Sequence, residues 1–288
     1  MLNNSFENQL KEMYSSAEEN INKIHLNELF PDIHEGCINF GYWENCSEII
    51  TLEERIISQK ALYQKLFSLF KPKAKQTVLE IGSGRGHAVN WLHNNEINCF
   101  GIDALTEQII KSQKRYPKLK KYFLQGLAEN IPFDDNIFDS VYSLEVAQHF
   151  FSFKHFAKES FRILKKNGIV CISSFFFVSE KFTKFVHELI PSSIEGTHNA
   201  ISIDQAILFL KDAGFVIEYL ESIGANVFPQ YAKWQQQKFQ NQCNLKSMAK
   251  EQKWESYYTG GGLGGEHPWS IVFRNNWIDY YIIKAVKR

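Results

Sequence analysis

The sequence predicts an α/β fold of the doubly wound type, built on a seven-stranded sheet. Apolar runs alternate with amphipathic helical patterns from about residue 51 to residue 220, which is typical of βαβ units. The first of these runs breaks into a glycine-rich turn, as buried parallel strands do at ligand-binding edges. The chain has 288 residues, of which 44% are hydrophobic, so one large domain can form a substantial core.

Capping and breaking residues set the expected element boundaries. Thr51 is a candidate N-cap with Glu54 at the capping-box position, and Pro72 ends the helix that follows. Pro117 ends a later helix, and Asn167-Gly168 is expected to stop another and turn the chain. The expected helices cover 51–70, 86–94, 106–115, 153–165 and 203–212. The expected strands cover 77–81, 97–102, 121–124, 140–144, 169–176, 216–222 and 278–286.

Three segments lie outside this alternating pattern. Residues 1–50 precede the first core helix and are expected to form an N-terminal lid, whereas residues 51–288 form the domain. Residues 178–202 and 224–276 are expected to be helical cap insertions that follow strands of the sheet. Because ligands bind beyond the carboxyl ends of parallel strands, these three segments are expected to build the acceptor pocket.

The glycine turn is the most informative motif. Residues 78–86 form the run Val-Leu-Glu-Ile-Gly-Ser-Gly-Arg-Gly, with glycines at 82, 84 and 86. A dinucleotide fingerprint would need its third glycine at position 87, which is His87. Asp103 ends the next strand about 20 residues later, where a carboxylate can bind both ribose hydroxyls of NAD or of S-adenosylmethionine.

A second block resembles the sequence around strands three and four of the class I S-adenosylmethionine-dependent methyltransferases, as the glycine turn resembles their first motif. The block runs from Gly126 to Phe133 and from Phe138 to Glu145. The resemblance covers roughly residues 36–222 and implies a Rossmann-like fold with S-adenosylmethionine as cofactor. Leu127 stands where the family has an acid, so adenine is expected to contact apolar and backbone groups near Ala128.

The resemblance implies a set of cofactor-binding residues on the glycine turn, after strand two, in the loop after strand three and at the end of strand four. These residues are Glu80, Gly82, Gly84, Gly86, Asp103, Ala104, Gln108, Leu127, Ala128, Glu129, Leu144 and Glu145.

His149 is the candidate catalytic residue because it closely follows the fourth strand. Methyl transfer is an in-line displacement, so the protein supplies alignment, exclusion of water and, where needed, a base. An imidazole could take a proton from a hydroxyl or an ammonium group, or it could only orient the acceptor.

Aromatic residues before the core suggest a lid. Residues 37–44, Cys-Ile-Asn-Phe-Gly-Tyr-Trp-Glu, resemble a segment that folds over the cofactor in small-molecule methyltransferases acting on sugars, sarcosine/dimethylglycine and tocopherol. Tyr42 and Trp43 are expected to stack on cofactor or substrate, or to anchor the N-terminal arm. Tyr14 is a further lid candidate, and His198 is a candidate in the insertion after strand five.

Composition narrows the class of partner. Lys+Arg and Asp+Glu both number 32, so no global charge favours nucleic acid. The five cysteines contain no CxxC pair, which predicts a reducing, cytoplasmic setting and no metal site. The apolar runs are too short for stable membrane insertion, and we expect a monomer or homodimer with a small-molecule acceptor.

Three functions remain open at this stage. The first is methyl transfer to a hydroxyl or amine of a small metabolite. The second is C-methylation or cyclopropanation of a lipid or isoprenoid, and the third is a non-catalytic protein that binds S-adenosylmethionine or S-adenosylhomocysteine.

Overall fold

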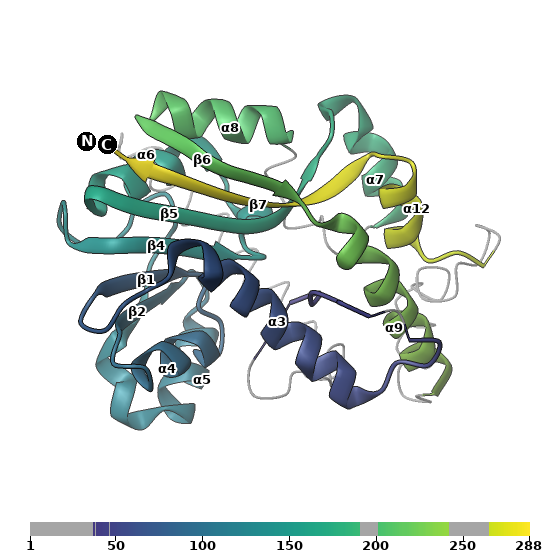
Figure 1. Ribbon diagram of the computed structural model, residues 1–288, viewed down its shortest axis with the longest axis horizontal. Helices are drawn as coiled ribbons and strands as arrows, with labels where there is room; N and C mark the ends of the chain where they lie inside the picture. The colour runs from purple at the N-terminus through teal and green to yellow at the C-terminus, as the bar shows by residue number, and fades with distance from the viewer. Residues whose placement is uncertain (1–36, 38, 46, 191–200, 242–264) are drawn as a thin grey trace.

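The computed structural model describes residues 37, 39–45, 47–190, 201–241 and 265–288 (Figure 1). Its strands are β1 (Thr77–Ile81), β2 (Asn98–Asp103), β3 (Phe123–Gln125), β4 (Phe138–Leu144), β5 (Leu164–Phe177), β6 (Phe215–Ser222) and β7 (Ile278–Lys287). They form one seven-stranded sheet in the order β3-β2-β1-β4-β5-β7-β6, in which β7 is antiparallel to both neighbours. The doubly wound α/β fold predicted from the sequence is therefore confirmed.

Helices cover both faces of the sheet. They are α3 (Leu52–Phe70), α4 (His87–His93), α5 (Thr106–Arg115), α6 (Phe153–Ile163), α7 (Thr183–Leu189), α8 (Ile203–Asp212), α9 (Phe228–Asn241) and α12 (Pro268–Arg274). Short 3-10 helices are η1 (Pro117–Tyr122), η2 (Ala147–His149), η3 (Glu180–Phe182) and η4 (Gly224–Asn226). Buried side chains of α3, α4 and α5 share one core cluster, and those of α6 and α8 share the other. The molecule is thus a three-layer sandwich around the sheet.

The helix α3 begins with the predicted capping box. The Thr51 side chain accepts a 3.2 Å hydrogen bond from the Glu54 N–H, and a Glu54 carboxylate oxygen accepts one of 2.7 Å from the Thr51 N–H. Two of the backbone donors that the first turn leaves without an intrahelical partner are satisfied in this way. The helix ends at Lys71, whose positive φ of 44° turns the chain toward β1.

Several element boundaries differ from the sequence-based expectation, and two of these differences have a clear cause. Residues 121 and 122 belong to a 3-10 helix, so β3 begins only at Phe123. The helix expected to reach residue 165 ends at Ile163, and β5 begins at Leu164. Leu164 pairs with Phe138, whereas Ile169 pairs with Ser140, so the Asn-Gly turn expected to separate helix and strand lies within an irregular start of β5.

Described parts of the two insertions are helical. Residues after β5 form η3 and α7, and residues between β6 and β7 form η4, α9 and α12. Phe228 of α9 stacks on Trp269 of α12, with 5.6 Å between ring centroids. No helix among the described residues is long and apolar enough to cross a membrane.

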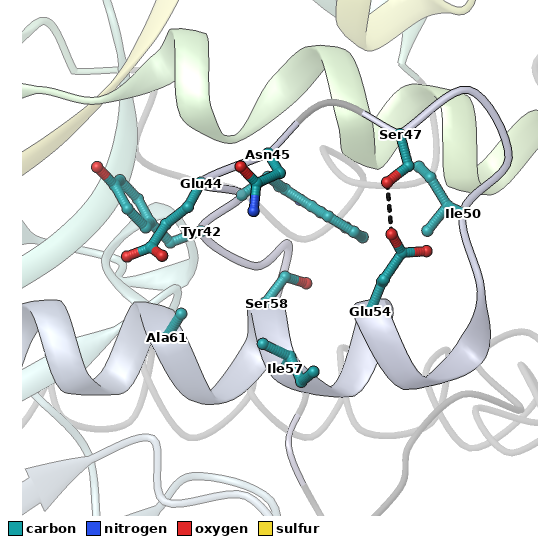
Figure 2. Close-up of a pocket in the computed structure, with 10 residues that line it drawn as sticks. Tyr42, Glu44, Asn45, Ser47, Ile50, Glu54, Ile57, Ser58 and Ala61 are labelled. Carbon is teal, nitrogen blue, oxygen red and sulfur yellow. Dashed lines mark hydrogen bonds between the residues drawn. The ribbon is translucent and has the colours of Figure 1, made fainter.

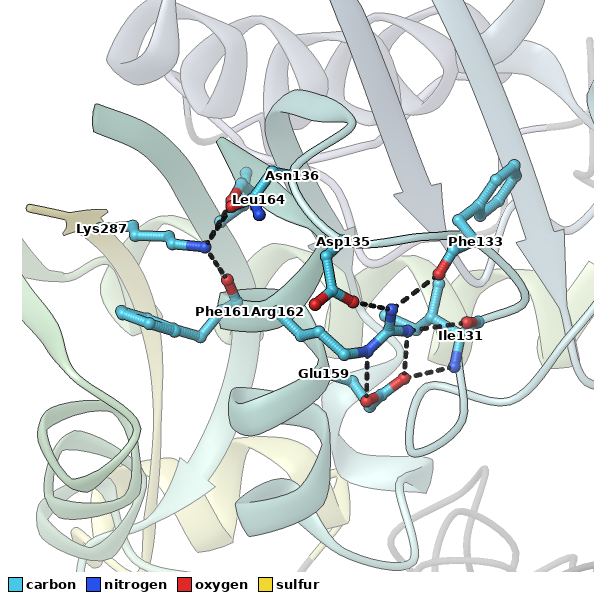
Figure 3. Close-up of polar contacts among 9 residues, drawn as sticks. All are labelled: Ile131, Phe133, Asp135, Asn136, Glu159, Phe161, Arg162, Leu164 and Lys287. Atoms are coloured by element: carbon cyan, nitrogen blue, oxygen red, sulfur yellow. Dashed lines mark hydrogen bonds and ion pairs between the residues drawn. The ribbon is translucent and has the colours of Figure 1, made fainter. Parts of the chain in front are cut away.

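Arg162 of α6 fixes the segment that leads into β4 (Figure 3). Its guanidinium donates hydrogen bonds of 3.0 Å to the carbonyl of Ile131 and 2.8 Å to the carbonyl of Phe133. The same group forms ion pairs of 2.8 Å with Asp135 and Glu159. This network ties the loop after β3 to α6, with which the loop shares a core cluster.

Lys287, at the end of β7, anchors the next residues of that segment (Figure 3). Its Nζ donates to Asn136 Oδ1 at 2.8 Å and to the carbonyls of Phe161 and Leu164 at 2.7 and 2.6 Å. The last strand therefore holds the turn before β4 in place.

Candidate functional site

The glycine turn follows β1 at the carboxyl edge of the sheet. Gly82, Gly84 and Gly86 adopt φ values of 76°, 48° and 77°, a region that strains other residues. A methyl group on Gly82 would lie 2.2 Å from Cγ2 of Val146, and one on Gly86 would lie 2.5 Å from Cζ of Phe123. A methyl group on Gly84 would meet no atom of the described residues within 4 Å. The turn therefore packs tightly at its two ends and faces open space at its centre.

Asp103 ends β2 beside this turn. Its Oδ2 accepts a hydrogen bond of 2.9 Å from the Gly84 N–H, and its Oδ1 accepts one of 2.9 Å from the Leu105 N–H. The half-buried Ala104 lies between the acid and the start of α5. The structure thus brings the predicted ribose-binding carboxylate against the centre of the glycine turn.

Two buried polar atoms beside the glycine turn and Asp103 have no hydrogen-bond partner among the described residues. They are Ser83 Oγ and Gln108 Oε1. An unpaired buried polar group costs about 1–3 kcal/mol, so such groups normally face a ligand or ordered water. A serine hydroxyl, an amide oxygen and an open stretch of main chain therefore lie at this edge of the sheet. Such groups fit a ligand that carries amino and hydroxyl groups, as the predicted cofactor does.

Glu80 lies inside β1 and is 1% exposed. The Tyr63 hydroxyl donates a hydrogen bond of 3.3 Å to its Oε1. Burial raises the pKa of Glu80 to about 8, although the hydroxyls of Tyr142 and Tyr63 oppose this rise. The Glu80 side chain therefore faces the protein interior and not the surface.

The loop after β3 contains the predicted adenine contacts. Leu127 is half-buried and forms an isolated bridge with Asn130, and Ala128 is buried. The Glu129 carboxylate is fully buried, and its Oε1 accepts hydrogen bonds of 2.8 Å from Phe151 N–H and 3.3 Å from Ser152 N–H. Glu129 therefore binds the start of α6, and this contact holds the loop in place.

Glu145 follows the buried Leu144 at the end of β4 and contacts the N-terminal segment. Its two carboxylate oxygens accept hydrogen bonds of 2.8 and 2.9 Å from the Phe40 N–H, and the Tyr280 hydroxyl donates to it at 3.1 Å. Burial raises the pKa of Glu145 to about 8, against the opposing effect of the Phe40 hydrogen bond. Glu145 thus links three parts of the chain: β4, β7 and residues 39–45, which we term the strap.

The strap is also bound by α3 and η4. Arg55 is 2% exposed and donates hydrogen bonds to the carbonyls of Asn39 and Phe40, the latter at 2.8 Å. Tyr42 N–H donates to the Ser58 carbonyl at 2.8 Å. Main-chain and side-chain contacts together therefore fix the strap over the carboxyl edge of β4.

Tyr42 and Trp43 line a cavity of about 160 Å³ between the strap and α3, with Ser58 and Ala61 on its helical side (Figure 2). The Tyr42 ring lies 5.0 Å from Lys65 Nζ. The buried Trp43 has the Arg55 guanidinium 5.8 Å from its ring. Cations of the chain itself thus lie against both rings, as expected for aromatic residues that anchor the arm.

His149 ends η2 and is exposed. Its Nε2 lies 3.4 Å from Nε2 of Gln148. Because β4 and β1 are neighbours, His149 lies on the same edge of the sheet as the glycine turn.

Tyr14 and His198, the two remaining predicted site residues, lie outside the described residues. Sequence reasoning missed Arg55, Gln148 and Tyr280. Arg55 was detectable, since it shares a helical face with Leu62 and Leu66 of α3, and a polar residue in a buried stripe needs partners. Gln148 precedes His149 directly, whereas Tyr280 gives no sequence signal.

Comparisons with known proteins identify this part of the chain with a methyltransferase domain. The family model described as a methyltransferase domain matches residues 79–172, which include the glycine turn, Asp103 and His149. Erythromycin 3''-O-methyltransferase of Saccharopolyspora erythraea is 25% identical over 264 residues, 84% of each chain. The 27-O-demethylrifamycin SV methyltransferase of Amycolatopsis mediterranei is 25% identical over 202 residues, 68% of this chain and 72% of that protein.

The solved structure of geranyl diphosphate C-methyltransferase from Streptomyces coelicolor has a TM-score of 0.66 to this chain. The two share 14% identity, and the match covers 87% of this chain and 91% of the other. At this identity the likeness concerns the fold.

Proposed function

We propose that this chain, which is a class I S-adenosylmethionine-dependent methyltransferase for small molecules, transfers the methyl group to a hydroxyl of a small metabolite. The observation that carries the proposal is the strap, which Glu145 and Arg55 fix over the edge that holds the glycine turn and His149. An enclosed edge suits a small acceptor. The names of the two curated relatives both refer to O-methylation, which supports a hydroxyl over an amine.

The residues around the glycine turn fit the cofactor. Asp103 offers carboxylate oxygens, Gly84 leaves open space, and Gln108 has a buried acceptor without a partner among the described residues. S-adenosylmethionine supplies a methyl group already activated on a sulfonium. The chain therefore has to bind the cofactor and the acceptor, orient them toward each other and exclude water from the site.

We expect His149 to contact the acceptor. It is exposed at the end of η2, and nothing in its position requires it for the core. Two roles suit it: taking the hydroxyl proton, or donating a hydrogen bond that orients the acceptor oxygen.

We also propose that the protein works in the reducing cytoplasm and does not bind nucleic acid. Cys99 and Cys171 are buried free thiols, which behave as small apolar side chains. The formal net charge is zero, so counterion release would contribute little to nucleic-acid binding.

The test begins with binding. Titration with S-adenosylmethionine should give saturable binding to the wild-type chain, and Asp103→Asn should weaken it by about tenfold or more because the ribose hydroxyls lose an anionic acceptor. Asp212→Asn, at an exposed position of α8, is the matched control and should bind as the wild type does.

The second step identifies the acceptor. The chain is mixed with cofactor and with sets of hydroxyl-bearing, amine-bearing and alkene-bearing metabolites, and S-adenosylhomocysteine and methylated products are measured. Products from hydroxyl compounds alone support the proposal. Products from alkenes would instead establish C-methylation or cyclopropanation, and cofactor binding without any product would establish a binding protein.

A further inference from the structure

Gln148 has both ends of its side-chain amide fixed by hydrogen bonds. Its Nε2 donates to the backbone carbonyl of Glu145 at 2.7 Å, and its Oε1 accepts from Ser174 Oγ at 2.6 Å. The third contact of the amide is with the neighbouring ring, where 3.4 Å separates Gln148 Nε2 from His149 Nε2. This residue therefore connects the end of β4, the buried Ser174 of β5 and the candidate catalytic imidazole.

The backbone carbonyl of Glu145 determines which way the amide faces. A carbonyl oxygen can only accept a hydrogen bond, so the amide atom 2.7 Å away must be the NH₂ group. The Ser174 hydroxyl then donates to the amide oxygen at the other end. Reversing the amide would place two acceptor oxygens against each other.

The orientation of the amide in turn determines the state of the ring. An amide NH₂ nitrogen donates and does not accept, so His149 Nε2 can contact it only through a lone pair. In neutral imidazole one nitrogen carries the proton and the other carries the lone pair. We propose that Gln148 is a positioning residue that holds neutral His149 with its proton on Nδ1.

This inference rests on the proposed function, and it separates the two roles left open for His149. With the lone pair of Nε2 facing the Gln148 amide, the ring carries its proton on Nδ1, so that nitrogen is an N–H donor and not a base toward the oxygen of a hydroxyl acceptor. Protonation of Nε2 would bring two N–H groups face to face. His149 therefore orients the acceptor oxygen, and the proton that this oxygen loses on methylation is released to solvent water instead of to the ring.

Nuclear magnetic resonance of the histidine nitrogens tests the proposal on the full chain, without acceptor and without turnover. In ¹⁵N-labelled protein at pH 8, we expect His149 Nδ1 to show the shift of a protonated nitrogen and Nε2 the shift of an unprotonated one. The His149→Asn variant identifies the signals, because only those of residue 149 disappear. A protonated Nε2 in the wild-type chain would overturn the proposal.

Gln148→Met supplies the second measurement, since it keeps the length of the side chain and removes the donor. We expect the proton of His149 to move mainly to Nε2, and turnover with a hydroxyl acceptor to fall about tenfold while the affinity for S-adenosylmethionine stays unchanged. An unchanged tautomer in a folded Gln148→Met chain would contradict the proposal. Gln76→Met, in the loop before β1 at the opposite edge of the sheet, is the control and should alter neither quantity.

The two proposals fail in different ways. If no hydroxyl compound is methylated, the proposed function is wrong, but the tautomer of His149 can still be measured. If hydroxyl methylation is found and His149 carries its proton on Nε2, the proposed function stands and the role of Gln148 is wrong.

Discussion

Glu145 shows how one residue can join distant parts of the chain. Its carboxylate receives the Phe40 N–H and the Tyr280 hydroxyl, and its backbone adopts a positive φ of 55°. Such a conformation is uncommon for a residue with a side chain and persists only where the surroundings stabilise it. The sequence places Glu145 among the cofactor residues, whereas the structure shows its carboxylate bound to the strap.

Replacing Glu145 by alanine should loosen the strap. The Phe40 N–H would lose its acceptor and remain partly buried, so we expect cofactor affinity to fall about tenfold, corresponding to about 1.4 kcal/mol. Isothermal titration with S-adenosylmethionine measures the change. Tyr280→Phe removes the hydroxyl that contacts Glu145 and Ser173 but leaves the Phe40 contact, so it should have a smaller effect on cofactor affinity. Equal affinities of Glu145→Ala and the wild type would show that the strap does not contribute to binding.

His149→Ala should reduce turnover far more than cofactor affinity. Loss of the imidazole leaves the acceptor without its aligned partner, and misalignment of this kind costs on the order of 100-fold in rate. Steady-state kinetics with a hydroxyl acceptor, together with a cofactor titration, separate the two quantities. His149→Asn keeps an N–H donor and should retain more turnover than His149→Ala. Unchanged turnover in both variants would make His149 a structural residue.

At the scale of elements, helix α3 links local sequence to the strap. Thr51 and Glu54 form its capping box, and one turn later Arg55 and Ser58 bind the strap. The position of these groups depends on where the helix begins. A defect at the cap should therefore affect both stability and binding.

Thr51→Ala should lower the free energy of unfolding by about 1 kcal/mol, the usual loss for an N-cap hydroxyl. Urea unfolding measures it, and a cofactor titration should show weakened binding as well. Ser202→Ala removes the same type of cap from α8, whose box pairs Ser202 with Gln205. That control should lose similar stability without losing affinity, because α8 lies in the other core cluster. Equal affinity losses in the two variants would contradict the link between α3 and the strap.

The type of each helix or strand followed from the sequence pattern, whereas two boundaries did not. One depends on strand pairing and the other on a short 3-10 helix. The capping box at Thr51 predicts the start of α3 because it is a local signal. The start of β5 could not be predicted locally, since Leu164 becomes a strand residue only by pairing with Phe138. Lys121 and Tyr122 end a short 3-10 helix, so β3 begins only after them. A 3-10 helix this short has no periodic signature in the sequence.

At the scale of the whole molecule, the two halves of the site were not equally predictable. The cofactor half comes from contiguous motifs, so the glycine turn and Asp103 were identified and lie together. The strap, which lies over the same edge, depends on contacts across the chain, such as Glu145 with Phe40 and Tyr280, at separations of 105 and 135 residues. Such contacts exist only in three dimensions, and no spacing in the sequence predicts them.

The buried carboxylates also give the whole molecule a pH dependence. The pKa of Glu80 is raised from 4.5 to about 8, chiefly by burial. Between these values the folded chain holds the proton and the unfolded chain releases it. Since the folded state then binds more protons, the contribution of Glu80 to stability is fully present below pH 4.5 and is lost as pH rises through about 8.

Glu80→Gln should therefore flatten the decline of stability with pH. One proton released on unfolding corresponds to a slope of about 1.4 kcal/mol per pH unit, and the variant should lack this contribution between about pH 5 and 8. Urea unfolding at intervals across that range measures the slope for variant and wild type. Glu53→Gln, at an exposed position in the first turn of α3, is the control and should keep the wild-type slope. If Glu80→Gln and the wild type lose stability at the same rate, Glu80 is already ionised in the folded chain, and the proton uptake must be assigned to Glu145, whose pKa is also raised to about 8.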